Sequence, residues 1–466
     1  MTTHTCDVAV IGAGTAGISA ERSARRQGAK TLLIDPEFAG TTCATVGCMP
    51  SKLLIAAADA AHGARGAAAF GVMARPEIDG RRVMARLREL RDGFVAGVRD
   101  MFASLPDGTC LTGRARFEGP GELSLGDGTR VQARTVVIAI GARPFIPDAF
   151  EAAGDLILTN ETLFELEDLP GSVGVIGAGP LGIELAQALA RLGVRVELFE
   201  RDRVVAGLPA PTGRALCDIL RREFPIRLNV SPAARRAGAQ VELDAGGATS
   251  RFDRLLIGAG RPPALDGLNL AATGLELDDR GMPDVDSATL QCCDAPVFMA
   301  GDANAARPLL HEAADEGTIA GRNAALFPDI APGPRKVAMG ITFTRPAAAV
   351  IGTIPDTGKD GALTGCSDYS GQGRARVMDR AAGSCRIHAD REGRLIGADL
   401  CAPGGEHLAH LLAWAVSWEK TAADLLELPF YHPTLEEGLR PALREICAAL
   451  GQDRPWNRDD GPTPGC

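Results

Sequence analysis

Two stretches of this sequence share one pattern: a short apolar run, a glycine-rich turn, a helix-forming segment and a second apolar run that ends in an acid. The first stretch, residues 6–35, contains Gly12, Gly14, Gly17 and the closing Asp35. Glycines let the backbone approach a pyrophosphate, and the helix that follows directs its positive N-terminal end at that charge. The acid is placed to bind a ribose hydroxyl, so the stretch predicts a dinucleotide-binding unit.

The second stretch, residues 172–200, repeats the pattern with Gly177, Gly179, Gly182 and the closing Glu200. Two such units in one chain indicate two nucleotides, commonly a flavin and a nicotinamide. Glu200 would accept a hydrogen bond from a 2′-hydroxyl and would repel a 2′-phosphate, so we expect NAD rather than NADP. Two arginines follow shortly after Glu200, so NADP remains an alternative cofactor.

Between the two units, Cys43 and Cys48 lie five residues apart. From Met49 the chain reads MPSKLLIAAADAA, a strong helix former, so Cys48 is expected near the N-cap, where the helix dipole would stabilise a thiolate. On a straight helix the two Cα atoms would be roughly 8–9 Å apart, too far for a disulfide, so a bend at Gly47 is expected. The pair is either a redox disulfide or two buried free cysteines.

The whole chain has 466 residues, which predicts two to four domains. Its net charge of -10 and pI near 5.4 argue against nucleic acid or an anionic membrane as a partner. The N-terminus lacks a signal-peptide pattern and no apolar run approaches a membrane span, so we expect a cytoplasmic protein. The 12 cysteines are scattered, as in a protein whose thiols are mostly reduced.

The segments around these motifs predict further elements. Residues 53–104 are expected to be helical with a glycine-rich interruption, and residues 109–135 to form a β-meander. Val136–Pro147 predicts a separate buried strand that leads into a glycine turn. A strand that starts near Ala295 ends in Asp302, which is either a ligand contact at a strand end or the N-cap of the next helix.

From about residue 335 the pattern predicts an α+β domain of short strands, one of them over residues 375–380, followed by helices over 407–419 and 435–450. His432 lies between these two helices in a proline-flanked loop with carboxylates a few residues on. This setting favours a catalytic base with an orienting acid.

These motifs occur in a fixed order: the first glycine turn, GTTCATVGCMPSK, the second glycine turn, AGD followed by LLHEA, and YHPTLEE. In this order they resemble the class I pyridine nucleotide-disulfide oxidoreductases over about residues 5–450, and most of all the dihydrolipoamide dehydrogenases. The resemblance implies an α/β fold of the glutathione reductase type, with two Rossmann-like domains and a C-terminal α+β dimerisation domain. The implied domains are FAD-binding (1–148 and 265–334), NAD-binding (149–264), dimerisation (335–450) and a mobile tail (451–466).

The resemblance also implies FAD and NAD as cofactors and gives each reacting group a role. Cys48 would be the charge-transfer thiol beside the flavin, and Cys43 the interchange thiol that meets the substrate. His432 would be the acid/base, with Glu437 as its partner. The family is a homodimer in which this histidine reaches the disulfide of the other subunit.

Lys52 matches the family lysine near flavin N5, and Glu184 matches the glutamate that pairs with that lysine. The positions that match FAD contacts are Gly12, Gly14, Gly17, Asp35, Thr42, Lys52, Ala115, Gly141, Asp302 and His311. The positions on the nicotinamide side are Gly177, Gly179, Gly182, Glu184, Glu200 and Gly260. No metal site is expected.

Some residues depart from the family pattern without removing a reacting group. Thr41 replaces the usual glycine before Thr-Cys, and Asp35 replaces the commoner glutamate. Phe430 and Tyr431 precede His432 where dihydrolipoamide dehydrogenases often carry His-Ala, which changes the predicted wall of the substrate channel.

Other residues disfavour neighbouring branches of the family. Glu200 and Ala206 occupy positions where NADP-dependent glutathione reductases carry arginines, and Cys466 stands alone where mercuric reductases carry a cysteine pair. Cys292 and Cys293 are adjacent and are expected to belong to the core.

The predicted function is oxidation of dihydrolipoamide to lipoamide with NAD⁺, through FAD and the Cys43–Cys48 disulfide. One alternative is an NAD(P)H-dependent reductase of another small disulfide, a metal or a sulfur compound. Another is a flavoprotein scaffold or redox sensor with a vestigial disulfide. A transhydrogenase is disfavoured because that branch lacks one redox cysteine. Expected partners are a second copy of the chain, a small dithiol or disulfide, and, as candidates, a lipoylated protein domain or an acyltransferase core.

Overall fold

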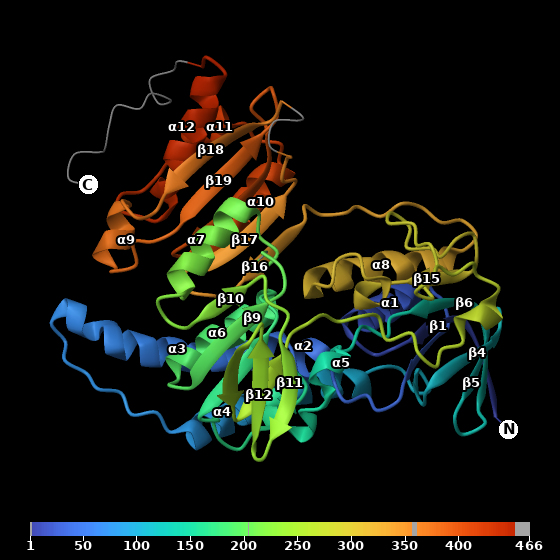
Figure 1. Ribbon diagram of the computed structural model, residues 1–466. Helices are drawn as coiled ribbons and strands as arrows, with labels where there is room; N and C mark the ends of the chain where they lie inside the picture. Colours follow the sequence, from blue (N-terminus) through green and yellow to red (C-terminus); the bar gives the residue numbers. More distant parts are fainter. Residues whose placement is uncertain (1, 204, 357–360, 453–466) are drawn as a thin grey trace.

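The computed structural model describes residues 2–203, 205–356 and 361–452. Figure 1 shows three regions built on sheets, with the N-terminal region on the right, the C-terminal region at the top and a central region below. The predicted α/β fold class is confirmed by this arrangement. Residues 453–466 of the predicted tail, with Cys466, lie outside the described residues. Among the residues that the structure describes, no helix is both long and apolar enough to cross a membrane.

The N-terminal region is a seven-stranded sheet with two helices packed on it, made of β1 (Thr3–Ile11), α1 (Thr15–Arg26), β2 (Thr31–Asp35), β3 (Cys110–Thr112), β4 (Ala115–Gly119), β5 (Glu122–Leu125), β6 (Arg130–Ile138), β15 (Val297–Met299) and α8 (Leu310–Leu326). The strand order is β3-β2-β1-β6-β5-β4, and β15 also pairs with β6. β1, β2, β3, β6 and β15 run parallel, so their carboxyl ends meet at one edge. Ile11, Ile34 and Ile138 lie in register at that edge.

Two predictions for this region were wrong in detail. The predicted meander over 109–135 includes β3, but β3 pairs in parallel with β2 instead of joining β4. The predicted separate strand from Val136 is the second half of β6, whose first half pairs with β5. The two halves differ because Val136, Val137 and Ile138 are fully buried between β1 and β15, whereas the earlier half alternates between buried and exposed residues.

The central region contains a parallel sheet of order β10-β9-β8-β14-β7 and a small antiparallel sheet. Its elements are α5 (Asp148–Glu151), η2 (Gly154–Leu156), β7 (Ile157–Leu158), η3 (Leu163–Glu165), β8 (Ser172–Ile176), α6 (Pro180–Arg191), β9 (Arg195–Glu200), α7 (Ala210–Leu220), β10 (Ile226–Leu228), β11 (Ala233–Ala237), β12 (Gln240–Ala245), β13 (Ala248–Phe252) and β14 (Arg254–Ile257). The next element, η4 (Leu270–Thr273), packs on β4 of the N-terminal region. Phe252 of the small sheet packs edge-on against Phe199 of the parallel sheet.

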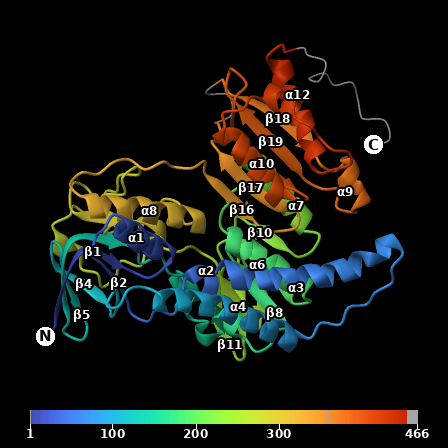
Figure 2. The ribbon, with the colours of Figure 1, turned by 180° about the vertical axis from the view of Figure 1, so that it is seen from behind.

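The segment that carries the two cysteines forms three helices and a short turn, α2 (Thr42–Thr45), α3 (Cys48–Gly66), η1 (Ala67–Phe70) and α4 (Gly80–Ala103). The helix expected from Met49 begins at Cys48, and the glycine-rich interruption expected within residues 53–104 lies at residues 71–79. Leu54, Ile55, Ala58 and Ala61 form the buried face of α3 and share one core with α6. The cysteine helix is thus fixed to the central region, and Figure 2 shows α3 crossing it.

The C-terminal region is an antiparallel sheet of order β16-β17-β20-β19-β18 that packs against helices. Its elements are β16 (Met339–Thr342), β17 (Ala347–Gly352), β18 (Leu363–Asp368), α9 (Gly373–Val377), β19 (Ser384–Ala389), β20 (Leu395–Ala402), α10 (Gly405–Ser417), α11 (Ala422–Leu426), η6 (Glu436–Leu439) and α12 (Arg440–Ala449). The short helix η5 (Gly301–Asn304) precedes them and lies next to α8 in the N-terminal region.

The strand predicted over residues 375–380 was wrong, because α9 begins before it and covers its first three residues. The Gln372 side chain caps α9 by accepting a hydrogen bond from Ala375 N. The strand β18 was not predicted from the sequence. Its buried positions are Gly365 and Ser367, so it lacks the apolar alternation that identifies a strand.

Candidate active site

The first glycine turn joins β1 to α1, and its three glycines differ in what surrounds them. Gly12 has φ +100°, and a Cβ there would lie 2.5 Å from Ala139 O. A Cβ on Gly17 would lie 1.8 Å from Gly12 O. A Cβ on Gly14 would meet nothing closer than Ala139 O, at 4.0 Å. The first and third glycines therefore serve the packing of the chain, and the middle one leaves space for a ligand.

The second glycine turn, between β8 and α6, repeats this arrangement. Gly177 has φ +100°, and its Cβ would lie 2.4 Å from Gly258 O. A Cβ on Gly182 would lie 2.1 Å from Gly177 O, whereas one on Gly179 would meet no heavy atom within 4 Å. Both turns thus have the shape that admits a pyrophosphate at a helix N-terminus.

Replacing the third and the middle glycine of the first turn should separate these two effects. Gly17→Ala is expected to lower the free energy of unfolding by about 3 kcal/mol, because the methyl group meets backbone. Gly14→Ala should change it by less than about 1 kcal/mol and weaken dinucleotide binding by about tenfold or more. Urea unfolding of the apoproteins and fluorescence titration with FAD measure the two effects. Equal stability of both variants would contradict this assignment.

The acid that closes each unit folds back onto its own glycine turn. Asp35 accepts a hydrogen bond from Ala13 N at 2.9 Å, and Glu200 accepts one from Ala178 N at 2.6 Å. The second oxygen of Glu200 accepts a hydrogen bond from Asp202 N at 3.0 Å. Each carboxylate therefore joins the end of its second strand to the turn, at the place where the sequence predicts a ribose.

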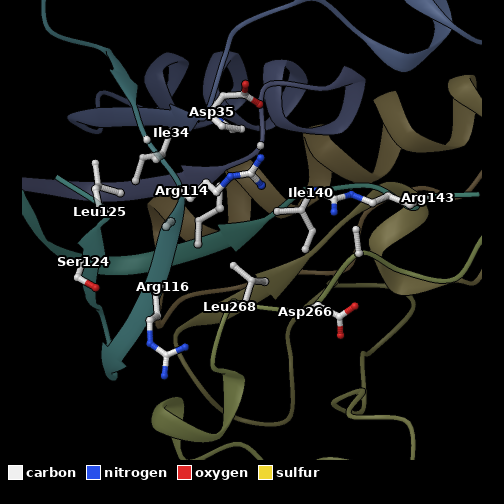
Figure 3. Close-up of a pocket in the computed structure, with 18 residues that line it drawn as sticks. Ile34, Asp35, Arg114, Arg116, Ser124, Leu125, Ile140, Arg143, Asp266 and Leu268 are labelled. Carbon is white, nitrogen blue, oxygen red and sulfur yellow. The ribbon is translucent and has the colours of Figure 1, made fainter. Parts of the chain in front are cut away.

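Two cavities adjoin the first turn. The larger, of about 480 Å³, is lined by Gly12, Asp35 and Ala115 among the residues predicted to contact FAD. Figure 3 shows Asp35 at one end of this cavity, with Arg114, Arg116 and Arg143 at other places around the cavity. The second cavity is lined by the largest group of predicted residues, namely Gly14, Thr42, Cys43, Cys48, Gly141 and Asp302. The structure thus places residues predicted to bind the cofactor, together with both cysteines, around the first glycine turn.

Lys52, Gly17, His311 and all the residues predicted on the nicotinamide side, Gly260 among them, line neither cavity. Gly17 is buried in the packing of α1. His311 is exposed on the first turn of α8, and Gly260, with φ +123°, follows β14 in the central region. The roles of these residues remain predictions.

Several arginines in these cavities were missed by the sequence analysis. Arg114, Arg116 and Arg143 line the first cavity, and Arg261 lines the second. Arg114 and Arg116 flank Ala115, and Arg261 follows Gly260, both of which were predicted to contact a cofactor. Their positions next to predicted contacts are the sequence signal by which these arginines could have been found.

Asp302 lies in η5 and contacts Arg261 Nη1 at 3.2 Å. The alternative role of Asp302 as an N-cap is wrong, because Leu309 is the N-cap of α8. Arg261 Nε is buried and has no hydrogen-bond partner among the described residues. An unpaired guanidinium nitrogen is costly to bury, so this corner of the cavity fits a polar or anionic cofactor group.

Cys43 lies on α2, and Cys48 is the first residue of α3. Cys48 was predicted near the N-cap, but the N-cap is Gly47, so Cys48 lies one position further on. The expected bend is present, because Gly47 leaves the helical conformation with φ −117° and ψ −120°. A Cβ on Gly47 would lie 2.8 Å from Thr42 O, so a larger residue would open the bend.

The two thiols, which are free here, differ in acidity. A hydrogen bond from the Cys43 thiol lowers the pKa of Cys48 to about 6, with help from the Lys52 ammonium and against the effects of burial and of Glu184. The same hydrogen bond, with burial, raises the pKa of Cys43 well above that of an ordinary thiol. The reduced pair is therefore a Cys48 thiolate held by a Cys43 thiol.

This difference predicts a pH dependence for alkylation of the reduced protein. The rate at Cys48 should rise through a midpoint near pH 6 and stay constant above it, because the thiolate is the nucleophile. Cys43 should react only in strongly alkaline solution. Iodoacetamide labelling followed by mass spectrometry of residues 31–52 measures both rates. A midpoint above pH 8 at Cys48 would contradict the prediction.

Lys52 and Glu184 meet as the sequence analysis expected, although they lie on different regions of the chain. Lys52 Nζ lies 2.7 Å from Glu184 Oε2, and Glu184 is nearly fully buried. The other oxygen of Glu184 accepts a hydrogen bond from Phe343 N at 2.7 Å, and the Lys52 ammonium also lies 4.5 Å from the Phe343 ring centre.

His432 also has the predicted partner. Its Nδ1 lies 3.1 Å from Glu437 Oε2, which also accepts a hydrogen bond from Thr434 N. The His432 side chain is 44% exposed. It lies between α11 and η6 in the C-terminal region, lines neither cavity, and is not among the groups that act on Cys43 or Cys48. His432 and the cysteines of one chain therefore do not form one site.

The geometry described so far defines a class of protein, an oxidoreductase with two dinucleotide sites and a cysteine pair. Residues 6–317 match the family model described as pyridine nucleotide-disulphide oxidoreductase, and residues 339–443 match its dimerisation domain. The chain belongs to this family. Its members use FAD and NAD(P), and the second match supports a homodimer.

Individual relatives agree with the family match. Dihydrolipoyl dehydrogenase 3 of Pseudomonas aeruginosa is 31% identical, with 94% of this chain and 97% of the relative covered. Dihydrolipoyl dehydrogenase of Thermus scotoductus is also 31% identical, with 95% and 97% covered.

Solved structures share the fold. LpdA of Mycobacterium tuberculosis has a TM-score of 0.81 at 26% identity, covering 96% of this chain and all of that one. The HOCl-induced flavoprotein disulfide reductase RclA of Escherichia coli has a TM-score of 0.81 at 22% identity, covering 94% of this chain and 99% of that one. The latter likeness concerns the fold alone.

Proposed function

We propose that this chain oxidises dihydrolipoamide with NAD⁺ through a redox disulfide of Cys43 and Cys48. The observation that carries the proposal is the polarised cysteine pair, in which Cys48 is acted on by the Lys52 ammonium and lines the same cavity as Cys43, Arg261 and Asp302. The relatives named dihydrolipoyl dehydrogenase support the choice of substrate. When bound, FAD supplies the two-electron carrier between the cysteine pair and NAD⁺.

The protein residues exchange the disulfide in two steps. His432 of the partner subunit takes a proton from one substrate thiol, and the resulting thiolate attacks Cys43 Sγ. The Cys43–Cys48 bond breaks, Cys48 leaves as a thiolate, and substrate and Cys43 form a mixed disulfide. The second substrate thiol gives its proton to solvent and attacks the first substrate sulfur, Cys43 leaves and takes up the proton that His432 accepted, and the substrate is released as a cyclic disulfide. One dithiol is oxidised and one disulfide is reduced.

The Cys48 thiolate suits the leaving role because its low pKa makes it the better leaving group. Glu437 contacts His432 through Nδ1 and so orients the imidazole that accepts the proton. The Glu200 carboxylate at the second glycine turn favours NAD over NADP, because it would repel a 2′-phosphate.

A second candidate function is reduction of another small disulfide, a metal or a sulfur compound with NAD(P)H. The observation that favours it is Tyr431, which is 83% exposed next to His432 and would narrow the approach of a long substrate. Both candidates use the same cysteine pair.

Steady-state turnover separates the two candidates. The FAD-loaded dimer should reduce NAD⁺ with dihydrolipoamide at a kcat/KM at least about a hundredfold above that for NADH-dependent reduction of glutathione disulfide, cystine or Cu(II). Faster turnover of any of these compounds would favour the second candidate. Absence of turnover with all of them would favour a scaffold or sensor.

A further inference from the structure

Two side chains of the segment that follows β18 hold the loop that carries His432. Gln372, the N-cap of α9, donates a hydrogen bond from Nε2 to Thr434 O at 2.6 Å. The Tyr369 hydroxyl donates one to Leu435 O at 3.1 Å. The two acceptors are carbonyl groups of adjacent residues, two and three positions after the histidine. Both side chains therefore fix the main chain just beyond His432.

Tyr369 and Gln372 are themselves held in place. Tyr369 is fully buried in the core of the C-terminal region, and a Cβ on Gly438 would lie 2.5 Å from its ring, so the ring lies directly against η6. Gln372 Oε1 accepts a hydrogen bond from Ala375 N at 2.7 Å. The amide of Gln372 thus caps α9 with its oxygen and holds the loop with its nitrogen.

The main chain that these side chains hold also determines where His432 and Glu437 meet. Glu437 Oε2 lies 3.1 Å from His432 Nδ1 and accepts a hydrogen bond from Thr434 N at 3.1 Å. The Leu435 carbonyl also accepts a hydrogen bond from Gly438 N at 3.0 Å, one residue beyond Glu437. A displacement of the chain at residues 434 and 435 would therefore move the carboxylate and the imidazole relative to each other.

We propose that Tyr369 and Gln372 are positioning residues for His432. They act through the main chain on which the contact between His432 and Glu437 is built. This inference rests on the proposed role of His432 as the base that takes a proton from the substrate thiol. Loss of either hydrogen bond lets the imidazole turn away from the dithiol at the partner subunit's Cys43, while both glycine turns keep their structure.

The two half-reactions of the FAD-loaded dimer separate a positioning role from a structural one. Reduction of the enzyme by dihydrolipoamide needs the base, whereas reduction by NADH does not. Tyr369→Phe keeps the ring and removes the hydroxyl, and it should slow the first reaction roughly three- to tenfold; Gln372→Ala should slow it roughly tenfold or more. Both variants should keep the parent rate with NADH. Stopped-flow absorbance measures both rates.

The pH dependence of the dihydrolipoamide reaction provides a second readout. The ordinary pKa of a thiol is about 8.5, so above about pH 9 most of the substrate is already a thiolate and needs no base. The deficits of Tyr369→Phe and Gln372→Ala should therefore shrink as the pH approaches 10. A variant with a loosened fold would keep its deficit.

Asp79→Ala is the matched control for Gln372→Ala. Asp79 caps α4 as Gln372 caps α9, because its side chain accepts a hydrogen bond from the backbone of the third helical residue, Arg82, at 3.0 Å. Asp79 lines neither cavity, so its replacement should leave both half-reactions unchanged. His432→Gln is the reference for a lost base and should slow the dihydrolipoamide reaction alone.

The outcomes distinguish this inference from the proposed function. A parent rate with dihydrolipoamide in folded Tyr369→Phe or Gln372→Ala would overturn the positioning role of that residue, and so would an equal slowing with NADH or a deficit that persists at pH 10. If His432→Gln itself reacted with dihydrolipoamide at the parent rate, the proposed role of His432 would fail, whatever the other variants did.

Discussion

Cys48→Ser is expected to abolish oxidation of dihydrolipoamide, with kcat lowered on the order of a thousandfold or more. Serine cannot form the disulfide that stores the electron pair, and its hydroxyl has no accessible anion at neutral pH. The Cys48 side chain lies at the start of α3 with space around it, so the fold should persist. NAD⁺ reduction, with FAD content measured in parallel, provides the test.

Cys43→Ser is the matched variant, because it removes the other sulfur of the same pair. Its turnover should fall as far as that of Cys48→Ser, but its remaining thiol should still react at Cys48. In Cys48→Ser the remaining thiol, Cys43, loses its contacts with the Cys48 sulfur but keeps its burial, which still raises its pKa, so it should alkylate more slowly near neutral pH than Cys48 does in Cys43→Ser. Fast labelling of both variants at pH 7 would contradict the division of roles.

A hybrid dimer of one Cys48→Ser subunit and one His432→Gln subunit is expected to keep about half of the parent activity. If His432 serves the cysteines of the partner, one of the two sites combines an intact cysteine pair with an intact histidine, whereas the other lacks both. If the histidine served its own chain, each site would carry one defect. Each homodimeric variant should lose about 10²-fold or more of the parent activity. Half of the parent activity in the hybrid is therefore easily distinguished from the loss expected when each site carries one defect.

The reciprocal hybrid is the control. One parent subunit paired with a subunit carrying both Cys48→Ser and His432→Gln should be nearly inactive, because each site then carries one defect. Half activity from this hybrid, together with loss of activity from the first, would show that the site lies within one chain. Separate affinity tags on the two subunits allow each hybrid to be isolated.

The parts of the fold that could be predicted from the sequence are those set by local chemistry. Gly12 and Gly177 are needed because the turn at each position has a positive φ and a backbone oxygen where a Cβ would lie. Residues 6–35 and 172–200 therefore identify their strands, turns and helices within one short stretch. Cys43, Gly47 and Cys48 are local in the same sense, because the bend between two helices requires a small residue.

The parts that could not be predicted depend on contacts between distant segments. Arg261 and Asp302 meet only after β14 and β15 have joined different sheets. Gln187 and Arg191 have the spacing of a solvated helix face, yet both are buried because a segment of the C-terminal region covers them. The strand β18 has small and polar buried residues, so no apolar pattern marked it.

Labelling of the peptide 31–52, which contains Cys43 and Cys48 as its only cysteines, tests the central claim most directly. The FAD-loaded, oxidised dimer is treated with dihydrolipoamide without NAD⁺, unfolded in guanidinium chloride that contains iodoacetamide so that both thiols react, and digested with trypsin. The account predicts no label on this peptide before treatment and two labels after one equivalent of dihydrolipoamide per site. A peptide that stays unlabelled while the same enzyme reduces NAD⁺ with dihydrolipoamide would contradict the claim.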